Sequence, residues 1–235
     1  SSHVKVWPAA RTRTIHHTLR WGWAEAAGWG TIPAMTTPPV SDDGLTTRQR
    51  RLRPALIVNT GDGKGKSTAA FGTALRAWHQ GWSIGVFQFV KSPEWRGGER
   101  EAFEALDRLY RETGVGGPVS WQAVGAGRTA TRKGSDREEQ ARAAATAWAE
   151  VRRRLAVQQH DFYVLDEFTY PLIYGWLDLD EVVATLADRP GTQHVVITGR
   201  RAPQPLLDLA TTVTEMTKLK HPFDTGQKGQ AGIEW

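Results

Sequence analysis

Short apolar runs alternate with longer segments of helical period from Ala55 to the end of the chain. Short runs rich in Val, Ile and Phe are typical of strands buried in a sheet. The segments between them place apolar side chains at three- and four-residue steps, which is the spacing of an amphipathic helix. The expected strands are residues 55–58, 83–90, 162–165, 194–198 and 211–217.

The same periodicity predicts helices between these strands. In residues 98–113, Phe103, Leu106 and Tyr110 fall on one stripe. Ser135 and Glu138 have the spacing of a capping box ahead of a long helix to about residue 159. Because strands alternate with helices, we expect one α/β domain whose mainly parallel sheet has helices on both faces. Further helices are expected at residues 69–75, 178–186 and 206–210.

A Gly-rich loop follows the first expected strand and precedes a helix. Its glycines allow backbone N–H groups to converge on an anion, while Lys66 reaches outer phosphates and the Ser67 hydroxyl binds Mg²⁺. The usual pattern G-x-x-x-x-G-K-[ST] has glycine where Thr60 stands, so the general motif fails at one position. The alternative is a Gly-rich turn with two solvated lysines, but the order of strand, loop and helix favours a nucleoside triphosphate. The loop is Thr60-Gly61-Asp62-Gly63-Lys64-Gly65-Lys66-Ser67-Thr68.

Charged residues end two other expected strands. Asp166 and Glu167 follow the run at 162–165, at the sheet edge that also carries the phosphate loop. Mg²⁺ takes hard oxygen ligands, so these carboxylates with Ser67 are candidate metal ligands, although an acidic pair can also be a helix cap. Arg200 ends the next strand and is either a triphosphate ligand or a surface arginine. These residues predict a P-loop NTPase-like (RecA-like) protein acting on ATP or GTP.

Composition narrows the class of protein. The formal net charge is +5, of which residues 1–34 hold +3, since Lys5, Arg11, Arg13 and Arg20 face one acid, Glu25. The remaining residues carry only +2, so we do not expect nucleic acid as a partner. No cysteine is present, which excludes disulfides and thiolate catalysis. No apolar run approaches the roughly 18–20 residues that cross a bilayer, and we expect a soluble, cytoplasmic protein.

The first 34 residues differ in character from the rest. They contain four tryptophans without a sustained period, and the first methionine is Met35. We expect Met35 to begin the natural protein, with an Arg-rich transit peptide as the alternative. Residues 36–43 are expected to form a flexible linker. The expected division is therefore a disordered or non-native leader and linker at 1–43 and a functional domain at 44–235.

Several motifs together resemble one enzyme family. They are T-G-D-G-K-G-K-S-T-A-A-F-G at 60–72, V-F-Q-F-V-K at 86–91, V-L-D-E-F-T-Y at 164–170, Q-H-V-V-I-T-G-R at 193–200 and the final segment 213–235. From about residue 44 onward the chain closely resembles the ATP:corrinoid adenosyltransferases of the CobA/CobO/BtuR type. The loop of that family is G-N-G-K-G-K-T-T, so the resemblance accounts for Thr60 in place of the first P-loop glycine.

The resemblance implies transfer of the 5′-deoxyadenosyl group of ATP to the cobalt of a corrinoid, with release of triphosphate. The nucleophile is then Co(I) and not a side chain, and ATP lies with its terminal phosphate deep in the loop. Lys66, Glu167 and Arg200 are the implied catalytic residues, and Ser67, Asp166 and Glu167 the implied Mg²⁺ ligands. A homodimer and a flavin-dependent reductase are further implied partners.

One element departs from the family pattern. The family carries G-[FW]-[ST]-W, whose aromatics pack on the corrin and ease reduction of cobalt, whereas this chain has Gly127-Arg128-Thr129-Ala130. Arg128 is expected to contact a corrin side group, and Trp121 or Trp95 either compensates or simply packs. Residues 45–53 are expected to supply the N-terminal helix that closes over the site in this family, the alternative being that their four arginines are simply solvated. Three functions follow: an active transferase, a degenerate member that binds ATP or corrinoid with weak transfer, or a generic P-loop ATPase or kinase.

Overall fold

The computed structural model describes residues 44–91, 97–124 and 134–233, without the side chains of 134–136. The described residues from Thr46 onward form one compact unit. Among the described residues, every helix is too short or too polar to span a bilayer. The elements are α1 (Thr47–Arg51), β1 (Leu56–Thr60), α2 (Lys66–His79), β2 (Ile84–Gln88), α3 (Gly98–Thr113), β3 (Val119–Ala123), α4 (Gly134–Ala156), β4 (Phe162–Asp166), α5 (Thr169–Ile173), α6 (Leu179–Ala187), β5 (His194–Thr198), α7 (Gln204–Leu209), β6 (Thr212–Glu215) and the 3₁₀ helix η1 (Pro222–Thr225).

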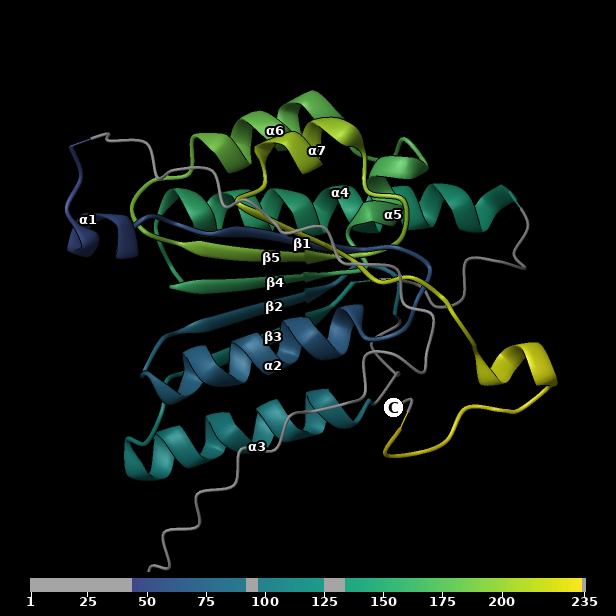
Figure 1. Ribbon diagram of the computed structural model, residues 1–235, viewed down its shortest axis with the longest axis horizontal. Helices are drawn as coiled ribbons and strands as arrows, with labels where there is room; N and C mark the ends of the chain where they lie inside the picture. Colours follow the sequence, from purple (N-terminus) through teal and green to yellow (C-terminus); the bar gives the residue numbers. More distant parts are fainter. Residues whose placement is uncertain (1–43, 92–96, 125–133, 234–235) are drawn as a thin grey trace, which may run out of the picture. The chain divides into compact units, whose positions relative to one another are not determined.

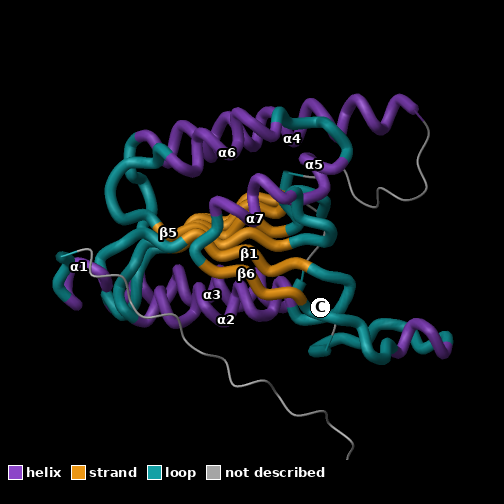
Figure 2. The backbone as a smooth tube through the Cα atoms, turned by 45° about the horizontal axis from the view of Figure 1, so that its top comes forward, coloured by secondary structure: helices purple, strands orange, loops and turns teal. Residues whose placement is uncertain are grey.

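The six described strands form one sheet in the order β3-β2-β4-β5-β1-β6, and all pairs are parallel. Helices α2 and α3 cover one face, and α4, α6 and α7 cover the other (Figure 1). Figure 2 shows the strands enclosed between these two helical layers. The expected α/β fold with a parallel sheet and helices on both faces is therefore confirmed.

Alternate residues of each strand supply the two cores. On β4, Phe162 and Val164 face the α2 layer, while Tyr163 and Leu165 face the α4 layer. The predicted stripe of α4 is buried there, with Trp148, Val151 and Leu155 each at most 2% exposed. A central strand that is buried on both faces is apolar at every position, whereas a strand with one exposed face alternates apolar and polar residues. The continuous apolar run at 162–165 is therefore typical of a central strand.

Most expected elements are present, with differences at their ends. Helix α3 has the predicted bounds, but α4 begins at Gly134, so Ser135 lies inside the helix and not at its N-cap. Strand β3 and helix α5 were not predicted individually. All five residues of β3 are only half-buried, and α5 contains Pro171 at its centre, so neither carries a clear period.

A buried polar cluster joins α4 to the amino-terminal side of the sheet. Arg154 Nη1 lies 2.9 Å from Ser120 Oγ and 3.1 Å from His160 Nε2, and Arg154 Nε donates to Glu150 at 2.7 Å. A guanidinium only donates, so Nε2 of His160 accepts and its proton is on Nδ1. Burial, followed by the charge of Arg154, lowers the pKa of His160 to about 4. The structure therefore needs a neutral imidazole at this position.

We expect this histidine to make the protein acid-sensitive. Its folded pKa of about 4 lies below the ordinary 6.5, so its contribution is fully present above pH 6.5 and is lost as the pH falls toward 4. At pH 5 the loss is about 2 kcal/mol relative to pH 8. In His160→Gln the amide oxygen still accepts from Arg154 but does not titrate. Urea unfolding at pH 8 and pH 5 should show a smaller difference for the variant, and equal differences would contradict the assignment.

Candidate active site

The Gly-rich loop connects the carboxyl end of β1 to the amino end of α2. Gly65 is the N-cap residue with φ 109°, and Gly61 has φ 93°, a left-handed region that favours glycine. A Cβ at Gly61 or Gly63 would lie 2.5 or 2.6 Å from the carbonyl oxygen of Met216. The N–H of Gly63 donates to that oxygen at 2.6 Å. The segment after β6 therefore packs directly on the loop, and only glycine permits the contact.

Thr60 occupies a structural position in place of the usual glycine. Its Oγ1 accepts from the N–H of Ala202 at 3.2 Å, and its carbonyl accepts from the N–H of Met216 at 2.9 Å. The residue is only 6% exposed. Its side chain therefore ties the first loop residue to the chain after β5, which accounts physically for the departure from the general motif.

A cavity of about 640 Å³ lies at the carboxyl edge of the sheet, around the loop. Its wall combines the loop with residues from the ends of β2, β4 and β5 and from the tail after β6. Of the predicted site residues, Thr60, Gly61 and Asp166 are not in the wall, and Arg128 lies outside the described residues. The lining residues are Asp62, Gly63, Lys64, Gly65, Lys66, Ser67, Thr68, Lys91, Glu99, Glu167, Tyr170, Thr198, Gly199, Arg200, His221, Gly229 and Ile233.

Four cations line this cavity: Lys64, Lys66, Lys91 and Arg200. Lys66 is the first helical residue of α2, and its Nζ donates to the carbonyl of Gly63. Burial, then the nearby Arg200, lower the pKa of Lys66. Arg200 lies 3.7 Å from Asp62, and both side chains are at least half exposed, so this pair is weak. Cations gathered at a helix N-terminus suit a polyanion such as triphosphate.

Asp166 and Glu167 are adjacent in sequence but differ in position. Asp166 is fully buried and accepts from Thr198 Oγ1 at 2.7 Å and Gln88 Nε2 at 3.0 Å. Glu167 has φ 57°, which turns its side chain into the cavity, and its N–H donates to Thr198 Oγ1 at 2.9 Å. Burial and the neighbouring Asp166 raise the pKa of Glu167 to about 7. A cation in the cavity would therefore stabilise the ionised form of the Glu167 carboxylate.

The residues present fit a Mg²⁺ ion that completes its shell with phosphate and water. The Ser67 hydroxyl and the Glu167 carboxylate are both in the cavity wall. Mg²⁺ keeps several waters and needs only one or two protein oxygens beside a phosphate. Within the described residues there is no group of three or more His, Cys, Asp or Glu side chains placed to hold a metal ion. A cation here would accordingly depend on the nucleotide for further oxygens.

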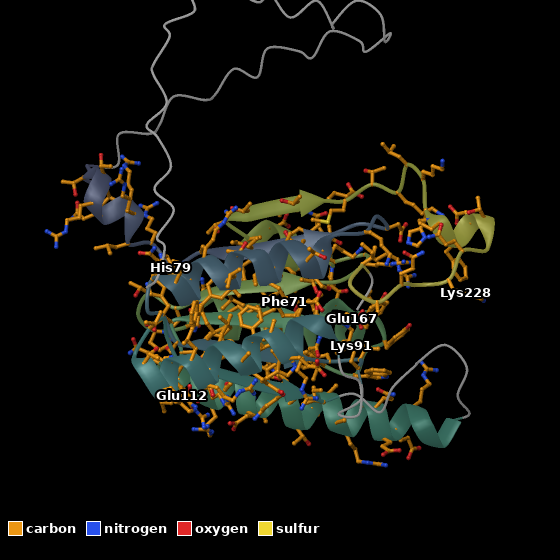
Figure 3. All side chains as sticks on the ribbon, turned by 90° about the horizontal axis from the view of Figure 1, so that it is seen from below. Phe71, His79, Lys91, Glu112, Glu167 and Lys228 are labelled. Carbon is orange, nitrogen blue, oxygen red and sulfur yellow. The ribbon has the colours of Figure 1, made fainter. Side chains whose placement is uncertain are left out.

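The cavity wall also contains residues that sequence reasoning missed: Lys91, Glu99, Tyr170, Thr198, Gly199, His221, Gly229 and Ile233. Lys91 had a usable signal, because it follows the second expected strand much as Glu167 follows the third. Figure 3 shows Lys91 and Glu167 together at the carboxyl end of the strands. The tail belongs to the family motif at 213–235, but no local pattern places it at the cavity, which it reaches because β6 pairs with β1.

Other expected contributions do not reach the cavity. Trp121 stacks on Phe71 with 5.2 Å between ring centroids, so it packs within the core, while Trp95 lies outside the described residues. Helix α1 has no buried residue and precedes the amino end of β1, whereas the loop follows the carboxyl end. None of its residues is in the cavity wall. The expected closing helix at 45–53 therefore forms, but not over this cavity.

The parallel sheet, the Gly-rich loop and the cationic cavity define a P-loop nucleotide-binding protein. Comparison with known proteins then identifies its family. The chain belongs to the ATP:corrinoid adenosyltransferase family BtuR/CobO/CobP, whose model matches residues 53–235.

Individual relatives cover most of the chain. It is 41% identical over 193 residues to the corrinoid adenosyltransferase CobA of Salmonella typhimurium, covering 82% of this chain and 91% of the relative. It is 42% identical over 210 residues to the corrinoid adenosyltransferase of Escherichia coli, covering 83% and 100%. The corrinoid adenosyltransferase of Pseudomonas aeruginosa is 38% identical, covering 82% and 89%.

Proposed function

We propose that this protein transfers the 5′-deoxyadenosyl group of ATP to the Co(I) centre of a corrinoid in cobalamin biosynthesis or salvage. A Co–C bond forms at C5′, the C5′–O bond breaks, and triphosphate leaves with the electron pair. The observation that carries the proposal is the cavity itself, where the phosphate loop and four cations meet a carboxylate in a member of this family. The cations and the loop N–H groups of such a site stabilise the negative charge on the leaving triphosphate.

Each residue has a distinct part in this proposal. Lys66, Lys64, Arg200 and Lys91 neutralise the departing triphosphate, and the loop N–H groups hold its oxygens. Ser67 and Glu167 hold Mg²⁺, which supplies further positive charge to the phosphates when bound. Asp166 supports the backbone of Glu167 indirectly, because both residues bond to the hydroxyl of Thr198. No side chain acts as nucleophile, because the cobalt of the substrate has that role.

An anaerobic assay with ATP and chemically generated Co(I) corrinoid tests this function. We expect adenosylated corrinoid and inorganic triphosphate in equal amounts. Release of phosphate or diphosphate instead would indicate a generic P-loop ATPase or kinase. Binding of ATP and corrinoid without product would indicate a degenerate member of the family.

The loop at Gly127-Arg128-Thr129-Ala130 gives a second test, since the family's aromatic pair is replaced there by Arg128 and Ala130. We propose that Arg128 contacts a corrin side group and that the lost aromatics weaken enzyme-assisted reduction of Co(II). Co(I) supplied directly should then be adenosylated well, whereas Co(II) with a mild flavin reductant should give little product. Arg128→Trp with Ala130→Trp should raise the Co(II)-dependent rate far more than the Co(I)-dependent rate.

The Co(I) assay is the internal control for this double variant. Equal gains in both assays, or no gain in either, would contradict a separate reductive role for this loop. The same preparations also allow a flavin-dependent reductase to be added as electron donor. We further propose a homodimer and a cytoplasmic location, both supported by resemblance to the family, and sedimentation at several concentrations tests the first.

A further inference from the structure

Four buried polar residues form one row across the carboxyl ends of the central strands. Gln88 of β2 is in register with Asp166 of β4, and Asn59 of β1 with Thr198 of β5. Each is at most 5% exposed. They follow apolar rows such as Val86, Val164 and Val196, and the row reaches the cavity at Thr198, which is in its wall. A buried polar group needs hydrogen-bond partners. Asn59 donates to the carbonyl of Lys66, while Gln88, Asp166 and Thr198 bond to one another.

The donors and acceptors fix the orientation of Gln88. The indole Nε1 of Trp121 can only donate, and it lies 3.2 Å from Gln88 Oε1. The amide NH₂ therefore points the other way and donates to Asp166 Oδ2 at 3.0 Å. If the amide were flipped, its NH₂ group would face the N–H of Trp121, and its oxygen would face the carboxylate of Asp166. Donor would then meet donor and acceptor would meet acceptor. Trp121 thereby sets which face of Gln88 meets the carboxylate.

The network continues from Asp166 to the cavity wall. Thr198 Oγ1 donates to Asp166 Oδ1 at 2.7 Å, and the same oxygen accepts from the N–H of Glu167 at 2.9 Å. Glu167 needs such support because φ 57° is an uncommon conformation for a residue with a Cβ. The chain of contacts therefore runs from Trp121 through Gln88, Asp166 and Thr198 to the backbone of Glu167.

We propose that Gln88 is a positioning residue for the Mg²⁺-binding carboxylate: it holds Asp166, and through Thr198 the turn of Glu167, in the geometry that meets the cation. This inference rests on the proposed function. Gln88 itself is not in the cavity wall, so we do not expect it to contact a bound nucleotide directly. Its effect must therefore fall on cation-dependent binding and not on contacts to the nucleotide as such.

The test replaces Gln88 with Met, which keeps an unbranched side chain of similar size but removes both hydrogen bonds. We expect the Kd of ATP in Mg²⁺ to rise about tenfold, because a buried charged acceptor loses a donor. The Kd of ATP in EDTA should change less than about twofold, since loop and lysine contacts remain. In the transfer assay, the KM for Mg-ATP should rise more than kcat falls.

Gln193 offers a matched control in the same fold. It is 3% exposed, and its Nε2 donates to the carbonyls of Leu155 and Pro190, away from the cavity. Gln193→Met should lower the melting temperature while leaving both Kd values unchanged. If Gln88→Met and Gln193→Met affect ATP binding equally, Gln88 only maintains the fold and the inference is overturned.

Trp121→Phe supplies an independent second variant, because it keeps a ring to stack on Phe71 but lacks the N–H that orients Gln88. It should weaken Mg-ATP binding about two- to threefold, and the double variant with Gln88→Met should be no weaker than Gln88→Met alone. Additive losses would overturn the inference. Should Gln88→Met not fold, Trp121→Phe decides alone: an unchanged ratio of the Kd values in Mg²⁺ and EDTA is the negative result.

Failure of the positioning role of Gln88 can be distinguished from failure of the proposed transferase function. If wild-type protein releases triphosphate but Gln88→Met binds Mg-ATP normally, only the positioning role is lost. If wild-type protein releases phosphate or diphosphate while the Mg²⁺-specific effect is present, the transferase proposal is lost and the positioning role remains.

Discussion

Replacing Lys66 with alanine is expected to abolish adenosyl transfer and to weaken ATP binding about 10- to 100-fold, corresponding to about 1.5–3 kcal/mol for one charged hydrogen bond. The residue is the first of α2, it lines the cavity, and its ammonium lies within reach of the loop carbonyl of Gly63. A triphosphate in the loop would displace that internal contact. The loss in rate should exceed the loss in affinity, because charge on the leaving oxygen grows in the transition state.

Isothermal titration with Mg-ATP and the Co(I)-dependent transfer rate measure the two effects. Arg76→Ala removes a positive charge from the exposed face of the same helix and should leave both quantities unchanged. Unchanged ATP affinity and rate in Lys66→Ala would refute the assignment of the loop to phosphate binding.

Glu167→Gln is expected to reduce transfer strongly while making the ligand-free protein more stable. The raised pKa of about 7 means that the ligand-free folded state resists ionisation of this carboxyl. The stability of the folded state therefore falls as the pH rises from the ordinary value of 4.5 through 7, and glutamine removes that loss. At about 1.4 kcal/mol per pKa unit, the gain at pH 8 is at most about 3.5 kcal/mol.

The same substitution removes the anionic ligand proposed for Mg²⁺. We expect ATP affinity in Glu167→Gln to become nearly independent of Mg²⁺ and transfer to fall about 100-fold or more, as when a preorganised charge is lost. Urea unfolding at pH 8, titration with and without EDTA, and the Co(I) assay measure these changes. Glu101→Gln, at an exposed position of α3, is the control for loss of one negative charge. Wild-type Mg²⁺ dependence in Glu167→Gln would show that another group holds the cation.

The strands and helices could be predicted because their signals are local. The central strands are buried on both faces and are continuous apolar runs, and α3 carries a clear helical stripe. The phosphate loop could be predicted because its function needs glycines, a lysine and a hydroxyl at fixed spacing in consecutive residues. Strand β3 could not be predicted in the same way, since its half-buried residues V-S-W-Q-A show neither a run nor an alternation.

The rest of the site depends on contacts between distant segments. Met216 explains why Gly61 and Gly63 lack side chains, and Ala202 explains Thr60, yet neither contact has a sequence signal at the loop. Lys91 enters the cavity because β2 is paired with β4, which carries Asp166 and precedes Glu167.

The sequence by itself determined the α/β class, the phosphate loop, the family and the pair of carboxylates at the end of β4, because each depends on consecutive residues. Only the tertiary structure decided which of the two carboxylates faces the cavity. The left-handed turn at Glu167 directs that side chain into the cavity, while Thr198 and Gln88, from two other strands, hold Asp166 below it. Strand order and register are set by packing over the whole sheet, so no local pattern could have separated these two neighbouring residues.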